Sequence, residues 1–91
     1  MAMVILTFKV MPSSPDVNLD ELTTFVHKSI TDFGGNLIET TIEPVAFGLK
    51  AIMIRFSLDE NRGSTDALEE SIADNEDVAS VETVAVSRAM G

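Results

Sequence analysis

The stretch EPVAFGLKAI places Phe47, one of five phenylalanines, in a segment suited to a turn. Pro44 cannot donate to a β ladder and therefore ends a strand, and Gly48 allows a backbone turn that a side chain would resist. Between them the chain presents Ala46 and Phe47, and Lys50 begins the next strand. A ring displayed in this way can insert into a partner as an anchor, whereas a ring that folds back would cover the end of its own sheet. Such a segment can support non-covalent binding. The sequence leaves open whether the Phe47 ring projects outward or covers the end of its own sheet.

Catalytic and metal-binding residues are scarce. His27 is the only histidine and there is no cysteine, so neither a Ser-His-Asp arrangement nor a thiolate site can be assembled. A lone histidine within a helix is usually a boundary residue. Gly34 and Gly35 end a helix and lack the context of a phosphate loop, and the acidic residues lack the spacing of a calcium loop. We expect no catalytic residue, no metal site and no cofactor.

Length and composition indicate one domain, residues 1–91, with a single core. Apolar residues make up 45% of the chain. No segment approaches the roughly 20 apolar residues that a membrane span requires. The apolar N-terminal run is interrupted by Lys9, which favours a strand over a signal peptide. We expect a soluble, cytoplasmic protein that does not contact a membrane.

The formal net charge is −9, from fifteen acidic and six basic residues, and the acidic residues concentrate in the second half of the chain. Such a surface repels phosphate backbones, so we expect no direct contact with nucleic acid. It would steer a basic protein partner, although the same charge could equally serve only to keep the domain soluble.

The first half of the chain predicts a strand followed by a helix. Apolar and polar residues alternate over residues 3–11, as in a strand. Asn18 and Glu21 have the spacing of a capping box at the start of a helix over residues 19–32, and Gly34 ends that helix.

The second half predicts strands over residues 36–42, 49–58 and 78–86, and a short helix that begins near Thr65 or Asp66. The periodicity also marks the apolar residues of each element. In the strand over residues 78–86, the apolar residues are Val81, Val84 and Val86. In the other elements, the residues expected to face the core are Val4, Leu6, Phe8, Val10, Leu19, Leu22, Val26, Ile30, Phe33, Ile52, Ile54, Phe56, Leu58, Leu68 and Ile72.

The order β-α-β-β-α-β predicts an α+β, ferredoxin-like sandwich, in which two helices cover one face of a four-stranded antiparallel sheet. The other face would remain open to water or to a partner. Two functions known on this fold are disfavoured. An acylphosphatase-like enzyme would need an arginine near the N-terminus, and the first 54 residues contain none. RNA-recognition domains display aromatic rings on the central strands, whereas Phe8 and Phe56 are assigned to the core.

Three stretches together resemble the archaeal elongation factor 1-beta family and the exchange domain of its eukaryotic relative. They are KVMPSSPDVNLDEL, which begins at Lys9, EPVAFGLKAI, and GSTDALEESI, which begins at Gly63. Each alone is a weak signal, but the three occur in the family's order and at its separations. The similarity extends over essentially all 91 residues.

The resemblance implies a guanine-nucleotide exchange factor for the translation GTPase elongation factor 1-alpha. In the family, the aromatic residue at the position of Phe47 wedges into the GTPase near its nucleotide site. A basic residue near the C-terminus, lysine in eukaryotic members, reaches the GTPase's magnesium site, and Arg88 occupies that position here. An arginine is bulkier and flatter than a lysine. The implied contact residues are Pro44, Ala46, Phe47, Gly48, Lys50 and Arg88.

An ACT-type regulatory module is the alternative, because it has the same topology and binds amino acids between paired domains. Such a module would have a glycine-rich turn after its first strand, where this chain has Pro12-Ser13-Ser14-Pro15.

Overall fold

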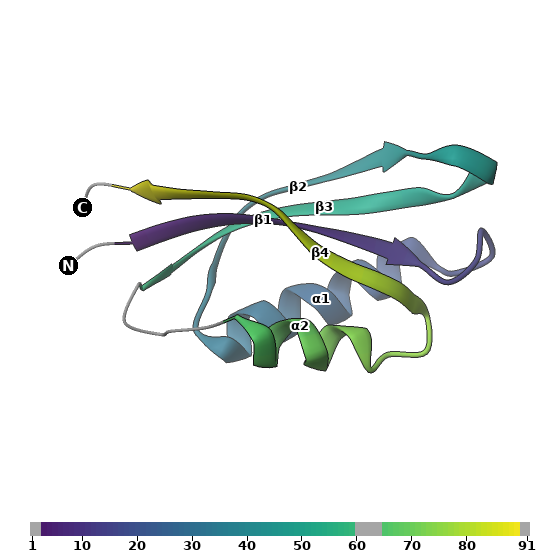
Figure 1. Cartoon of the computed structure of the whole chain (residues 1–91). Coiled ribbons are helices and arrows are strands. Elements are labelled where there is room, and N and C mark those ends of the chain that lie inside the picture. The colour runs from purple at the N-terminus through teal and green to yellow at the C-terminus, as the bar shows by residue number, and fades with distance from the viewer. Residues whose placement is uncertain (1–2, 60–64, 90–91) are drawn as a thin grey trace.

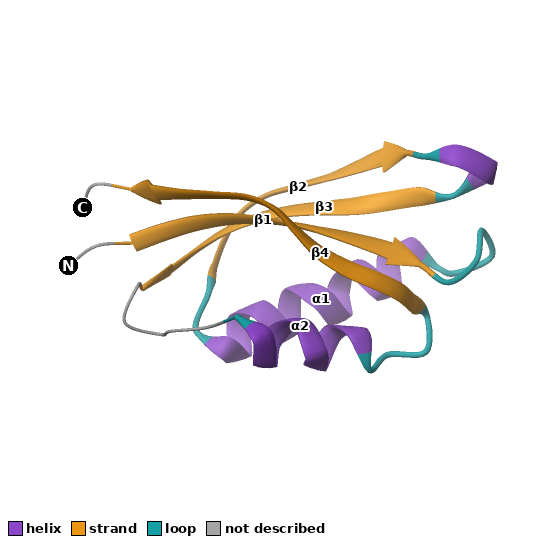
Figure 2. Cartoon of the chain, in the orientation of Figure 1, coloured by secondary structure: helices purple, strands orange, loops and turns teal. Residues whose placement is uncertain are grey.

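The computed structural model describes residues 3–59 and 65–89. The elements are β1 (Met3–Pro12), α1 (Leu19–Phe33), β2 (Asn36–Pro44), the 3₁₀ turn η1 (Ala46–Gly48), β3 (Lys50–Asp59), α2 (Asp66–Ala73) and β4 (Val78–Ala89). The strands form one antiparallel sheet in the order β2-β3-β1-β4. Both helices lie on the same side of the sheet (Figures 1 and 2). The predicted α+β ferredoxin-like sandwich is confirmed.

The core lies between the sheet and the two helices, on the strand faces that the sequence predicted. From Leu6 onward in β1 and from Ile52 onward in β3, every second residue is buried, because successive side chains of a strand point to opposite faces; Ala51 is buried as well. Phe8 and Phe56 are both fully buried and meet edge to face, with ring centroids 4.9 Å apart. The helices add Leu22, Val26, Ile30, Leu68 and Ile72.

Helix α1 begins and ends where its capping residues predicted. The Asn18 side-chain oxygen accepts a hydrogen bond from the Glu21 backbone N–H at 3.1 Å, which satisfies one of the free donors of the first turn. Gly34 has φ 104° and donates its N–H to the Thr31 carbonyl at 3.0 Å. At Gly35 a Cβ would stand 2.6 Å from the Ile30 side chain, so this residue lets the chain turn closely from α1 into β2.

Strand β4 differs from its prediction in length and in the burial of its valines. It runs to Ala89, and its pairing with β1 shifts between Thr7 and Phe8, which leaves Val84 as an extra residue opposite the shift. Val84 and Val86 are 46% and 64% exposed, whereas Val78 is buried. The shift accounts for Val84, which has no partner on β1. Val86 lies opposite the buried Leu6, and its exposure follows from the edge position of β4, which has a neighbouring strand on one side only.

The face of the sheet away from the helices carries polar and apolar side chains together. Arg55 of β3 pairs with Glu39 of β2 at 3.4 Å, and both side chains are about half exposed. Such an ion pair contributes about 0–1 kcal/mol. Within the described residues, no helix is long and apolar enough to cross a membrane.

Candidate partner-binding site

The loop between β2 and β3 is a short, hydrogen-bonded turn at one end of the sheet. Pro44 is the last residue of β2 and lies opposite Lys50, the first residue of β3. Inside this pair, the Val45 N–H donates to the Leu49 carbonyl at 2.8 Å, and the Leu49 N–H donates to the Ala46 carbonyl at 3.3 Å. These bonds close the loop around η1. We call the segment from Pro44 to Lys50 the tip.

Phe47 is displayed at the tip. Its side chain is 94% exposed, so the alternative in which the ring folds back over its own sheet is wrong. Its backbone has φ 63° and ψ 31°, in the left-handed region, and Gly48 follows with φ 75°. A residue with a side chain costs about 1–2 kcal/mol in this conformation. The loop therefore holds a large apolar ring in water and accepts backbone strain to do so.

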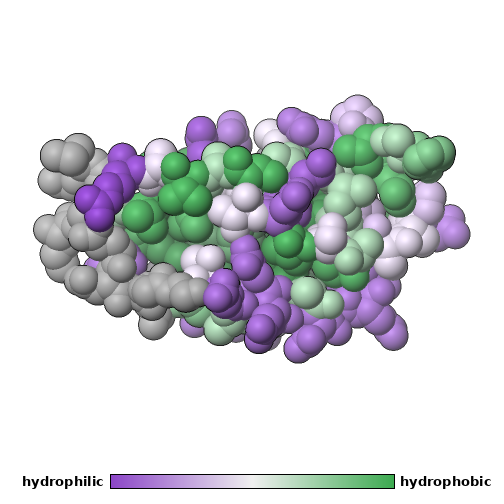
Figure 3. All heavy atoms as spheres, viewed as in Figure 1, coloured by the Kyte–Doolittle hydropathy of each residue, from purple (hydrophilic) through white to green (hydrophobic). Residues whose placement is uncertain are grey.

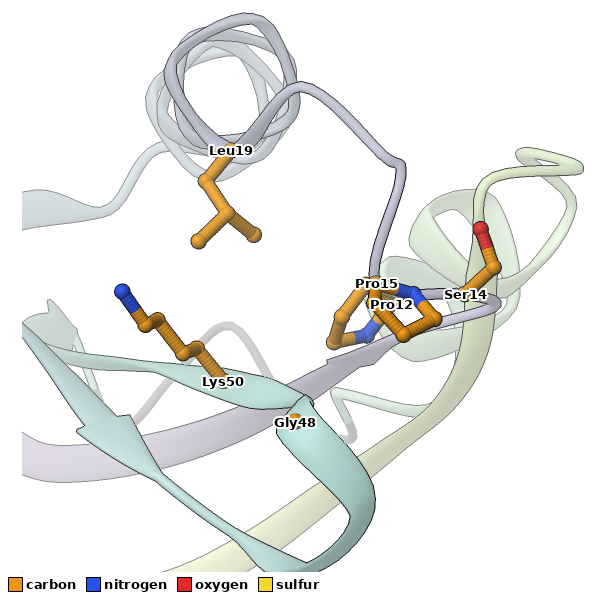
Figure 4. A pocket seen from close by; sticks show the side chains of 6 residues that line it. All are labelled: Pro12, Ser14, Pro15, Leu19, Gly48 and Lys50. Carbon is orange, nitrogen blue, oxygen red and sulfur yellow. The ribbon is translucent and has the colours of Figure 1, made fainter.

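A pocket of about 230 Å³ lies beside the tip, between the β1–α1 turn and the start of β3 (Figure 4). It brings together two of the sequence stretches that carry the family resemblance, because its lining residues come from both. They are Pro12, Ser14, Pro15, Leu19, Gly48 and Lys50. Sequence reasoning missed the contribution of the first stretch. The Pro12-Ser13-Ser14-Pro15 segment was the available signal, but its local pattern does not place it beside Gly48 and Lys50.

The tip gathers five of the six expected contact residues but not Arg88. Arg88 lies near the end of β4 opposite Val4, which in turn pairs with Leu58 near the end of β3. Leu58 is eight residues along β3 from Lys50, and at about 3.4 Å per residue this corresponds to about 27 Å. Figure 1 shows the end of β4 and the tip at opposite ends of the sheet. Phe47 and Arg88 are therefore too far apart to enter the same small pocket of a partner.

Charge is distributed unevenly between the two layers. The strands carry four basic and four acidic residues, which are Lys9, Lys50, Arg55 and Arg88 against Glu39, Glu43, Asp59 and Glu82. The net charge of −9 therefore comes from residues outside the strands. In Figure 3 the helix side of the visible face is mainly hydrophilic, while hydrophobic atoms gather on the strand side, both toward the termini and at the end of the molecule that carries the tip.

His27 lies between α1 and β2, where its Nε2 is 2.7 Å from the Thr40 hydroxyl oxygen. The half-buried imidazole thus joins a helix to an edge strand, in agreement with a boundary residue. Among residues 3–59 and 65–89, no three histidine or acidic side chains come together in a way that could hold a metal ion.

Residues 5–89 match the family model described as the EF-1 guanine nucleotide exchange domain. The chain belongs to this family. It is 39% identical to elongation factor 1-beta of Methanococcus aeolicus, over 96% of this chain and 98% of that protein. It is 38% identical to elongation factor 1-beta of Halobacterium salinarum, over 97% of this chain and 99% of that protein. The resemblance that the sequence motifs indicated is confirmed, and the chain has a guanine-nucleotide exchange role in translation elongation.

Solved structures show the same fold in proteins of other families. The crystal structure of the ACT domain from GTP pyrophosphokinase of Chlorobium tepidum superposes with a TM-score of 0.61, over 88% of this chain and 96% of that chain. Its sequence identity is 14%, so the likeness shows the fold alone. The ACT-type alternative gains no support beyond topology.

Proposed function

We propose that this chain, residues 1–91 acting as one exchange domain, binds elongation factor 1-alpha and promotes the release of GDP. The observation that carries the proposal is the display of Phe47, 94% exposed on a hydrogen-bonded turn. Full burial of such a side chain in a partner contributes about 1.5–3 kcal/mol. The loop bonds hold the backbone that carries the ring in place beforehand, so ordering of the loop adds little cost on binding.

The tip would act by binding, without a covalent step. A GTPase holds its nucleotide through phosphate-cradling backbone N–H groups, a lysine and a bridging Mg²⁺. A protein that binds the empty GTPase more tightly than the loaded GTPase must weaken nucleotide binding by the same factor, because the two equilibria are linked. An aromatic wedge that displaces the elements around the nucleotide would have this preference.

Arg88 would contact a second region of the same GTPase. Its separation of about 27 Å from the tip along the sheet, at about 3.4 Å per residue, means that one domain would span two areas of the partner. A guanidinium that approaches the magnesium site would disfavour Mg²⁺ by repulsion between like charges. The tip and Arg88 thus have separate roles, and variants at the two ends can be tested separately.

The acidic helix layer supports the expectation that the domain does not bind nucleic acid directly. The two helices carry six acidic residues and one lysine, and this excess would repel phosphate groups. The same layer would favour approach to a basic partner. We place the protein in the cytoplasm, where translation elongation takes place.

The test is the rate at which a fluorescent GDP analogue leaves elongation factor 1-alpha, measured by stopped flow with increasing amounts of this protein. Phe47→Ala should raise the concentration needed for half-maximal release about 30-fold, which corresponds to about 2 kcal/mol. Its thermal unfolding midpoint should stay at the wild-type value, because the ring is exposed.

Ile38→Ala is the matched control, since Ile38 is an exposed apolar residue of β2 outside the tip. It should release GDP like the wild type. Wild-type exchange by Phe47→Ala would overturn the proposal, and unfolding of Phe47→Ala would show that the ring serves the core instead.

A further inference from the structure

The pocket beside the tip is lined by three apolar side chains, a hydroxyl group and one charged group. Pro12, Pro15 and Leu19 supply the apolar surface, and Gly48 leaves the side next to Phe47 open. Figure 4 shows Lys50 extending along the hollow toward Leu19, with the two proline rings across from them. The pocket thus combines three apolar side chains with a single ammonium group.

Lys50 lacks a carboxylate partner within the part of the chain that the structure describes. Ser14 also lines the pocket, but its hydroxyl oxygen accepts from the Asp16 N–H at 3.2 Å and points away from the hollow (Figure 4). A matching occupant would combine a short apolar stem, for the proline and leucine surface, with an anionic end for the ammonium group. Glutamate and aspartate side chains have this chemistry.

We propose that the pocket receives one carboxylate side chain from the surface of the GTPase that docks on Phe47. This inference rests on the proposed exchange function and adds a second contact to it. The volume of about 230 Å³ is large enough to admit one side chain. It exceeds the volume of about 150 Å³ that holds benzene in an engineered cavity, and it is smaller than the about 300 Å³ at which small-molecule sites begin.

The pocket and the ring belong to one contact surface. Gly48 lines the pocket and directly follows Phe47, and Lys50 is three residues from the ring. A partner that encloses the ring therefore covers the mouth of the pocket as well. A single aromatic anchor leaves the partner free to rotate about it, whereas a second, charged contact fixes the orientation.

The charge of Lys50 in the pocket is also opposite in sign to the net charge of the molecule. The net charge of −9 attracts a basic partner at long range, whereas Lys50 selects an acidic residue at short range. A basic partner docked in a wrong orientation would place a cation against the ammonium group and be repelled. The pocket would thereby select the orientation in which the ring enters its site.

The experiment compares Lys50→Glu with Lys28→Glu in the release of the fluorescent GDP analogue from elongation factor 1-alpha. Lys28 is an exposed residue of α1 outside the pocket, and both replacements change the net charge equally. Lys50→Glu should raise the half-maximal concentration about tenfold more than Lys28→Glu does. Lys50→Met, which keeps the apolar stem, should fall between the wild type and Lys50→Glu, and its half-maximal concentration should depend less on salt than that of the wild type.

The decisive result is rescue by charge exchange. Among variants in which one surface glutamate or aspartate of the GTPase is changed to lysine, one should restore exchange with Lys50→Glu and impair exchange with the wild type. Equal effects of Lys50→Glu and Lys28→Glu, together with a strong loss in Phe47→Ala, would overturn the pocket proposal and leave the exchange function standing. Wild-type exchange by Phe47→Ala would instead overturn the proposed function itself.

Discussion

The core and the tip use the same side chain in opposite ways. Phe56 is fully buried and meets Phe8 edge to face, whereas Phe47 is 94% exposed on a left-handed backbone. Burial of Phe56 removes apolar surface from water and stabilises the fold. Phe47 leaves its apolar surface in water and adds backbone strain. It therefore contributes favourable free energy only when a partner covers the ring. The comparison predicts that truncation of the two rings affects different properties.

Phe56→Ala should have the largest effect on stability. Removal of a buried ring destabilises a domain by about 3–5 kcal/mol, through lost burial and the cavity that remains. Total stabilities are commonly about 5–15 kcal/mol, so much of the fold's stability would be lost. Urea unfolding followed by circular dichroism measures the change. A loss below about 1 kcal/mol would mean that this end of the core can repack, which would weaken the contrast with the tip.

Gly35→Ala should destabilise the fold to a smaller extent. The added Cβ would stand 2.6 Å from the Ile30 side chain and 3.2 Å from the Phe56 ring, so the start of β2 would have to move away from α1. Overpacking of this kind costs about 1–3 kcal/mol. The same urea titration measures it, and an unchanged midpoint would show that the junction between α1 and β2 can adjust.

Gly48→Ala is the counterpart of that substitution at the tip, where a Cβ would meet no atom within 4 Å. Its cost arises only from φ 75°, at about 1 kcal/mol. Because a changed tip would aim the ring differently, GDP release should slow more than the small loss of stability explains. Exchange at the wild-type rate, together with the expected loss of stability, would show that the ring tolerates movement of the loop.

Phe47→Asn should have the smallest effect on stability, below about 0.5 kcal/mol, because the side chain is exposed and asparagine tolerates the left-handed region. It keeps the backbone of the tip and removes the ring. GDP release should fall as far as it does in Phe47→Ala. If Phe47→Asn retained exchange, the backbone turn and not the ring would be the active feature of the tip.

The sequence was sufficient to predict the elements that depend on local chemistry and on periodicity. Asn18 and Gly34 marked the ends of α1 through capping, and alternation placed Phe8 and Phe56 in the core. Pro44 and Gly48 marked the turn that displays Phe47. These predictions succeeded because capping, alternation and turn formation involve residues a few positions apart in the chain.

The burial of edge residues was beyond that reasoning. Val84 and Val86 have the pattern of a buried strand, but a register shift against β1 leaves Val84 unpaired, and the edge position of β4 leaves Val86 exposed although it lies opposite Leu6. Register depends on the partner strand, whose alignment is decided by packing across the sheet. Periodicity within one strand does not carry that information.

By itself, the sequence determined the fold class, the core faces of the central strands and the helices, the position of the turn at the tip and the family, because each follows from local patterns or from motifs in order along the chain. Only the tertiary structure decided that Pro12 and Pro15 join Lys50 in one pocket, and that Arg88 lies at the far end of the sheet from Phe47. These are relations between residues of different elements. They arise when antiparallel pairing and helix packing bring distant parts of the chain together. Neither the composition nor the spacing of residues along the chain indicates how far apart two such residues lie in space.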